Sequence, residues 1–154
     1  MLKTERIANL EIFNGLTQEE INAIISISQE VIYNKNEVII EEFTRDSDLF
    51  VLLEGRVRVE IEGSHYCEAQ DKKMELVLLR RGDIFGEIAF LKYTRSSAYV
   101  TAIDEIRIMR IDGEKLYELF DRNNHAGYVL MRNLAIVLSK RLVCLNFKWR
   151  DGSK

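Results

Sequence analysis

The sequence contains no proline, and its 154 residues include only two histidines and two cysteines. The histidines, His65 in a polar segment and His125 at an expected helix start, are too few to predict an enzyme. A metal-dependent enzyme would need several histidine and carboxylate ligands that converge on one point. A Ser-His-Asp or Cys-His arrangement needs a histidine beside its nucleophile. We therefore expect no catalytic activity, no metal and no cofactor.

Other absences limit the location of the protein. Cys67 and Cys144 could form at most one disulfide bond, and we expect free thiols in a reducing cytoplasm. No apolar run approaches the ~20 residues of a membrane span, and the N-terminal segment MLKTERIANLEIF lacks the apolar core of a secretory signal. The formal net charge of −3 gives no electrostatic reason to expect a nucleic-acid or anionic-membrane partner. We expect a cytoplasmic protein.

The composition fits one compact domain. Hydrophobic residues make up 47% of the chain and charged residues 31%, which is ordinary for a globular protein. No internal repeat or low-complexity tract marks a linker. We therefore expect residues 1–154 to form a single domain, with N-terminal helices over about 1–30, a β-barrel over 31–111 and C-terminal helices over 112–150.

The first well-marked helix begins after Thr17. Thr17 and Glu20 have the spacing of a capping box, in which each side chain bonds the backbone amide of the other residue. Leu16 and Ile21 occupy the positions of a hydrophobic staple. These signals predict a helix over about 18–29.

From Val31 to Ile111 the apolar pattern changes to a period of two. It is clearest over Arg56–Glu62, and the segments 74–79 and 106–111 are predicted to be further strands. The polar segment 63–73 is expected to be a hairpin loop. Many short strands at close spacing favour an antiparallel β jelly roll, a double-stranded β-helix barrel, over a βαβ sheet. With its flanking helices, the fold class is α+β and mainly β.

Asp112 is a plausible N-cap for a helix over 114–121, and a longer helix should run from about His125 to Trp149. The apolar residues of the longer helix form two opposed stripes, whereas a helix that lies on one core needs only one. Both stripes could be covered within the chain by the N-terminal helices. We prefer a symmetric homodimer about this helix. The stripes are Met131, Leu134, Leu138, Leu142, Leu145 and Trp149 on one side, and Val129, Ile136, Val143 and Phe147 on the other.

The segment Phe85–Ala102, FGEIAFLKYTRSSAYVTA, has the order of groups that a phosphate site needs. Gly86 lets the backbone approach an anion, and the amides that follow open a helical turn. Glu87 can accept a hydrogen bond from a sugar hydroxyl, and an arginine in the next loop can bind phosphate oxygens. The same pattern also fits an ordinary strand, turn and helix whose first-turn glutamate is favoured by the helix dipole.

Five segments resemble the cyclic nucleotide-binding domains of the catabolite activator protein and of the protein kinase A regulatory subunit. The resemblance covers most of the chain, with the segments in the expected order, and implies a stand-alone module of this family. The segments are Phe13–Leu16 (FNGL), Leu49–Gly55 (LFVLLEG), Gly82–Ala89 (GDIFGEIA), Ser97–Ala102 (SAYVTA) and Ser139–Leu142 (SKRL).

The resemblance implies that Glu87 binds the ribose, while Gly86 and the backbone amides of Ile88 and Ala89 bind the phosphate. We expect the side chains of Ile88 and Ala89 to lie in the core. Ser97 could bond a phosphate oxygen or the base, or its own backbone.

The chain departs from the family pattern in the following loop. Family cassettes have an arginine where this chain has Ser96, and Arg95 lies one residue earlier. Neighbouring side chains of an extended segment point to opposite faces, so Arg95 should point away unless a bulge redirects it. Lys92 is a further cation, although it lacks the fork of an arginine. Two family glycines are replaced, by Asn36, which tolerates left-handed backbone, and by Phe43.

The sequence thus predicts a non-enzymatic sensor of cyclic AMP or cyclic GMP that signals through its last helix to an unknown downstream protein. The alternative is a ligand-free dimerisation or scaffold module of the same fold. No direct DNA binding is expected, since a helix-turn-helix after the long helix would need some 60 further residues.

Overall fold

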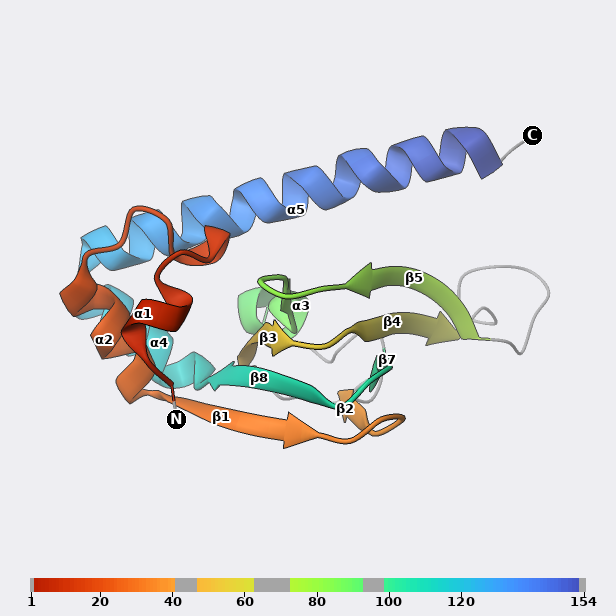
Figure 1. Cartoon of the computed structure of the whole chain (residues 1–154). Helices are drawn as coiled ribbons and strands as arrows, with labels where there is room; N and C mark the ends of the chain where they lie inside the picture. The colour runs from red at the N-terminus through yellow and green to blue at the C-terminus, as the bar shows by residue number, and fades with distance from the viewer. Residues whose placement is uncertain (1, 41–46, 63–72, 93–98, 153–154) are drawn as a thin grey trace.

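The computed structural model describes residues 2–40, 47–62, 73–92 and 99–152. Helices α1, α2 and α4 gather at one end of two β-sheets, and the long helix α5 runs from that end along the sheets (Figure 1). The antiparallel, mainly β arrangement with flanking helices confirms the predicted fold class. The expected closed barrel is not present within the described residues, where no strand pairing joins the two sheets.

Each sheet has four strands, and every pairing is antiparallel. In chain order the strands are β1 (Ser28–Tyr33), β2 (Val38–Ile40), β3 (Leu49–Glu54), β4 (Val57–Glu62), β5 (Lys73–Leu79), β6 (Ile84–Phe85), β7 (Tyr99–Ala102) and β8 (Ile106–Ile111). One sheet has the order β1-β8-β3-β6 and the other β2-β7-β4-β5. The strands predicted over 56–62, 74–79 and 106–111 are confirmed to within one residue, and the loop expected over 63–73 lies outside the described residues except for Lys73.

Strand β3 separates two hydrophobic cores. Leu49 and Val51 face a core shared with the helices, whereas Phe50 and Leu52 face the core between the sheets. Side chains alternate along a strand, so a strand covered on both faces is apolar at consecutive positions. This explains why β3 has the continuous run LFVLL, with its first four residues no more than 2% exposed.

The N-terminal segment contains α1 (Thr4–Ile7), the 3₁₀ turn η1 (Glu11–Phe13) and α2 (Gln18–Ser26). The predicted capping box is confirmed: the amide of Glu20 donates to Thr17 Oγ1 at 3.1 Å, and the amide of Thr17 donates to Glu20 Oε1 at 2.9 Å. The helix ends at Ser26 rather than at residue 29, because Ser28 already pairs with β8.

The carboxylate of Glu20 also anchors the start of α5. Its side chain is buried, and His125 Nδ1 lies 2.9 Å from both carboxylate oxygens. Burial raises the pKa of Glu20, but the hydrogen bonds from Thr17 and His125 outweigh that effect and hold the pKa below its usual value. The Glu20 carboxylate of the capping box therefore connects the start of α2 to the start of α5.

The C-terminal helices are α4 (Gly113–Arg122) and α5 (Asn124–Gly152). Asp112 caps α4 as predicted, accepting a hydrogen bond from the amide of Lys115 at 3.0 Å. The 29 residues of α5 give a length of about 43 Å. Asn133, which is buried, donates to the carbonyl oxygens of Ile12 and Asn14 at 2.8 Å each, so the N-terminal segment is fixed to α5.

The two apolar stripes of α5 are covered to different extents. Leu134 is buried and Leu138 packs against the helical core, but Leu142 in the same stripe is 60% exposed. In the opposite stripe Val129 is buried, whereas Ile136 and Val143 are 37% and 52% exposed. Coverage by the N-terminal segment therefore stops partway along α5.

Candidate functional site

The turn between β6 and α3 (Glu87–Lys92) is fixed by close packing around Gly86. Gly86 has a φ of 79°, in the left-handed region that favours glycine. A Cβ there would lie 2.8 Å from Phe50 Cδ2 and 2.9 Å from the carbonyl oxygen of Asp48. Phe85 pairs with Phe50 across the sheet, and their rings stack with centroids 5.0 Å apart. Any residue larger than glycine at position 86 would therefore have to displace Phe50 or the backbone at Asp48.

Two buried apolar side chains of helix α3 hold it in place, one of them against α4. Ala89 and Phe90 are buried. The Phe90 ring stacks on the ring of Tyr117 in α4, with 4.7 Å between the ring centroids. The Tyr117 hydroxyl donates to the carbonyl oxygen of Phe90 at 2.6 Å. The position of α3 is thereby coupled to that of α4.

Asp48 connects the same turn to the start of α4. Its carboxylate accepts a hydrogen bond from Arg110 Nε at 2.6 Å and from the amide of Gly113 at 3.0 Å. A Cβ at Gly113 would lie 2.2 Å from the carbonyl oxygen of Ser47, so the start of α4 packs directly on the backbone that precedes β3. One residue therefore contacts both the Gly86 turn and the N-terminus of α4.

Arg141 is the residue of this site that the sequence argument missed. It reaches from α5 to the Gly86 turn, where Nη2 donates to the carbonyl oxygen of Ile84 and Nη1 lies 3.4 Å from Glu87 Oε1. The side chains of Arg141 and Glu87 are only 19% and 16% exposed. Nothing in the local sequence pattern indicates a contact across 54 residues of chain.

The predicted site residues fall into two groups. The structure brings Gly86, Glu87, Ile88 and Ala89 together at the start of α3. The expectation that the Ile88 side chain lies in the core is wrong: it is 44% exposed, because α3 turns only its Ala89 and Phe90 face inward. Arg95, Ser96 and Ser97 lie outside the described residues.

Two other positions test the family pattern. Asn36 has a φ of 73°, which confirms that it takes the left-handed conformation in place of a glycine. Phe43 lies outside the described residues. Lys92, at the last position of α3, is exposed.

The described part of the chain holds no group of three or more histidine, cysteine, aspartate or glutamate residues that could bind a metal ion. Within the same ranges, no helix is both long and apolar enough to cross a bilayer.

Known proteins resemble this chain in sequence and in structure. Residues 30–123 match the model of the cyclic nucleotide-binding domain. The cyclic AMP receptor protein of Thermus thermophilus is 25% identical over 131 residues, which are 85% of this chain and 56% of that protein. The cyclic GMP-binding protein C of Dictyostelium discoideum is 31% identical over 122 residues, 75% of this chain but only 4% of its own length.

Among solved structures, a protein of Geobacter metallireducens GS-15 superposes with a TM-score of 0.78 at 29% identity, over 92% of this chain and 99% of its own. The chain spans no more than about half the length of the curated relatives named above. The family match covers more than half of this chain and contains the Gly86 turn, strands β2–β8 and all but the first two residues of β1. The chain belongs to the cyclic nucleotide-binding domain family.

Proposed function

We propose that the chain is a regulatory module that binds cyclic AMP or cyclic GMP at the Gly86 turn and has no catalytic role. The backbone amides of Glu87, Ile88 and Ala89 open α3 without intrahelical partners and would donate to the cyclic phosphate. The Glu87 carboxylate would accept a hydrogen bond from the ribose hydroxyl.

The observation that carries this proposal is the close packing around Gly86. It fixes the backbone at the start of α3, and the contact with Arg141 Nη1 at 3.4 Å positions the Glu87 carboxylate. A preformed site costs less ordering on binding than a flexible one. The names of the two curated relatives support the ligand class, since one is a cyclic AMP receptor and the other binds cyclic GMP.

In this proposal the loop that follows α3 completes the ligand site. Arg95, Ser96 and Ser97 would lie near the phosphate, and substitution of Arg95 and of Ser96 tests the contribution of the first two. The single-domain organisation over 1–154 and the cytoplasmic location stay predictions.

The signal would pass through the C-terminal helices to a downstream protein. Phe90 and Asp48 connect the turn to α4, and Arg141 connects it directly to α5. A ligand can shift such an arrangement only by its different affinity for the two positions of the helices. Contacts from the turn to both helices give the bound nucleotide a means of favouring one position.

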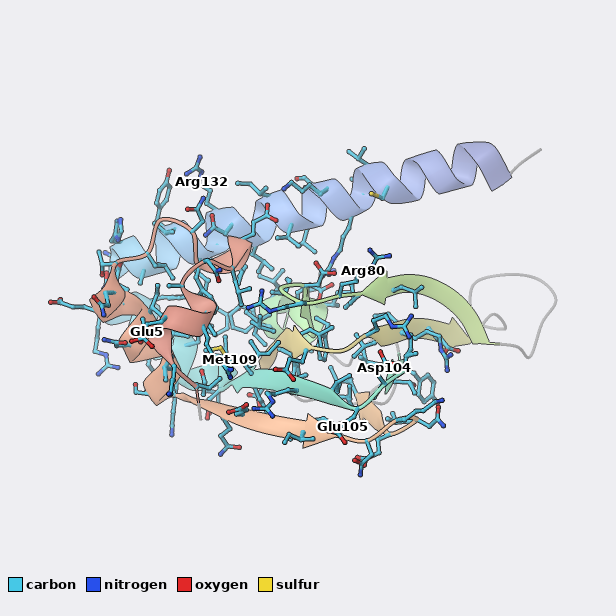
Figure 2. All side chains as sticks on the ribbon, in the orientation of Figure 1. Glu5, Arg80, Asp104, Glu105, Met109 and Arg132 are labelled. Atoms are coloured by element: carbon cyan, nitrogen blue, oxygen red, sulfur yellow. The ribbon has the colours of Figure 1, made fainter. Side chains whose placement is uncertain are left out.

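We further propose that α5 forms a homodimer with a second copy of the chain. Ile136 and Val143 are exposed on one side of α5, and Arg132 projects from α5 away from the sheets (Figure 2). Ala135 and Ser139 on the same surface of α5 are small, so another helix could approach closely. The second stripe, which continues past the part that the N-terminal segment covers, supplies the apolar surface of that contact.

Isothermal titration calorimetry with cyclic AMP and cyclic GMP tests the ligand site. Glu87→Ala should weaken binding by about 1.5–3 kcal/mol, or ten- to 150-fold, the scale of a hydrogen bond to a charged group. Glu118→Ala, which removes an exposed carboxylate from α4, is the matched control and should bind as the wild type does. Equal affinity of the Glu87 variant and wild type would mean that no sugar occupies this position.

The ligand-free dimerisation or scaffold module is the second candidate. The substitution of the family arginine by Ser96 favours it, because an arginine-phosphate contact is lost. A wild-type protein that dimerises but binds neither nucleotide would decide for this candidate.

A further inference from the structure

A second cleft lies between α1 and the sheet that contains β1, β8 and β3 (Figure 1). Its volume is about 150 Å³, which at roughly 30 Å³ per molecule is room for about five waters. Pockets for drug-sized ligands measure about 300–1,000 Å³. The cleft therefore suits a group of the size of a phosphate, not a whole nucleotide, and none of its described lining residues belongs to the Gly86 turn.

The walls of this cleft carry more positive than negative charge. Four cationic side chains come from the α1 segment, from the turn between β5 and β6 and from β8, and two carboxylates come from β1 and β3. An excess of positive charge in one small cleft attracts an anion. The cations are Lys3, Arg6, Arg81 and Arg107, and the carboxylates are Glu30 and Glu54.

Arg107 is already paired with both carboxylates. Its Nη1 lies 2.7 Å from Glu30 Oε1, and its Nε lies 3.8 Å from Glu54 Oε2. The Glu30 side chain is only 13% exposed, so the closer pair lies at the inner wall of the cleft. Two carboxylates balance more than the charge of one guanidinium, and Arg107 therefore leaves no positive charge over for a ligand.

The other three cations are exposed, and none of them forms an ion pair with a residue that the structure describes. Lys3 and Arg6 are three positions apart at the start of α1, a spacing that makes them neighbours. Arg81 Nη2 donates to the carbonyl oxygen of Arg6 at 3.4 Å, which holds Arg81 against α1. That bond uses one of the five N–H donors of Arg81. Three like charges that meet in this way repel each other, and a bound anion would offset the repulsion.

We infer that this cleft is a second ligand site, which binds a phosphate dianion, either as inorganic phosphate or as the phosphomonoester group of a small molecule. Lys3 and Arg6 bind it from the α1 segment, and Arg81 binds it from the turn between β5 and β6. A phosphomonoester carries a charge of about −1.5 to −2 at pH 7, on three acceptor oxygens that match the three cations. A cyclic nucleotide carries less charge because it is a diester. Size and charge both select against it here, so the inference does not depend on the proposed function.

The test is a nuclear magnetic resonance titration of the ¹⁵N-labelled chain with inorganic phosphate and, separately, with O-phosphoserine. Sodium chloride keeps the ionic strength constant, because salt screens such contacts. The amides of Lys3–Ile7 and Arg81 should show saturable shifts. Arg81→Gln should weaken binding about five- to ten-fold, between the effect of an exposed ion pair and that of a charge-assisted hydrogen bond. Arg80→Gln is the matched control: it removes the same charge from an exposed neighbour that does not line the cleft, and it should leave the affinity unchanged.

Glu54→Gln should change the affinity in the opposite direction. The Glu54 carboxylate lines the cleft, is 60% exposed and repels an anion. Its removal should strengthen phosphate binding about two- to five-fold, which a purely structural role of these side chains does not predict. Circular dichroism checks that each variant folds, and Arg6→Gln takes the place of Arg81→Gln if the latter does not.

The outcomes separate this inference from the proposed function. Binding of both probes supports a site for phosphomonoesters, and binding of phosphate alone supports a site for the free ion. The inference is overturned if neither probe gives saturable shifts at tens of millimolar, if Arg81→Gln binds as the wild type does, or if Arg80→Gln loses as much affinity as Arg81→Gln. A wild type that binds phosphate in this cleft but neither cyclic nucleotide supports the inference and overturns the proposed function.

Discussion

Replacement of Gly86 by alanine tests the geometry on which the ligand site depends. Left-handed backbone costs a residue with a Cβ about 1–2 kcal/mol. The new Cβ would also lie 2.8 Å from Phe50 Cδ2 and 2.9 Å from the Asp48 carbonyl oxygen, and the second of these is backbone. Forcing the strand and the turn apart costs about 1–3 kcal/mol more. Gly86→Ala should therefore lower the free energy of unfolding by about 2–5 kcal/mol, and Tm by roughly 5–20 °C.

Gly82→Ala is the matched control, because it shares the backbone strain without the close contacts. Gly82 has a φ of 91°, but its Cβ would meet only Leu10 Cδ2 at 3.5 Å, an ordinary contact. The expected loss is about 1–2 kcal/mol from strain alone. Both variants can be measured by urea unfolding followed by circular dichroism. An equal loss in the two variants would refute the close approach at Gly86, and no loss in either would refute the left-handed backbone.

Three further predictions concern the dimer, the loop and the pH dependence of stability. Replacing Ile136 and Val143 together by glutamate should give a folded monomer in light scattering, and a wild type that is monomeric at high micromolar concentration contradicts the dimer. Ser96→Arg should strengthen nucleotide binding about ten-fold through a bidentate phosphate contact, while Arg95→Ala changes little; the reverse pattern would indicate a bulge that turns Arg95 inward. The pKa of Glu20 is lower in the folded state than its ordinary value of 4.5. The ionised carboxylate therefore stabilises the fold above pH 4.5, and this stabilisation is lost as the pH falls through the folded-state pKa. In Glu20→Gln the free energy of unfolding should depend less on pH below about 4.5 than in the wild type. An unchanged pH dependence would contradict the role given to this carboxylate.

Features set by local chemistry could be predicted from the sequence. The Thr17 capping box and the Asp112 cap depend on residues three positions apart, and both are present. The strand β4 and the left-handed Asn36 likewise follow from single residues or their immediate neighbours. In each case the interacting groups lie close together in the chain, so their spacing alone defines the structure.

Features that depend on distant contacts could not be predicted in this way. The last turn expected for α2 is replaced by the pairing of Ser28 with Ile111, which only the assembled sheet provides. The contact of Arg141 with Glu87 depends on the path of α5 over the turn. The exposure of Ile88 depends on which face of α3 packs against α4. Helical periodicity indicates which residues share a face, but not which element covers it.

A nuclear magnetic resonance titration of the ¹⁵N-labelled wild type with cyclic AMP and cyclic GMP tests the central claim most directly. Binding at the Gly86 turn predicts large, saturable shifts of the backbone amides from Gly86 to Ala89, with 5′-AMP as the open-chain control. Amides of α5 near Arg141 should shift at the same ligand concentrations, since both report one binding event. Unchanged Gly86–Ala89 amides at millimolar nucleotide, or shifts confined to another part of the chain, would contradict a cyclic nucleotide site in this turn.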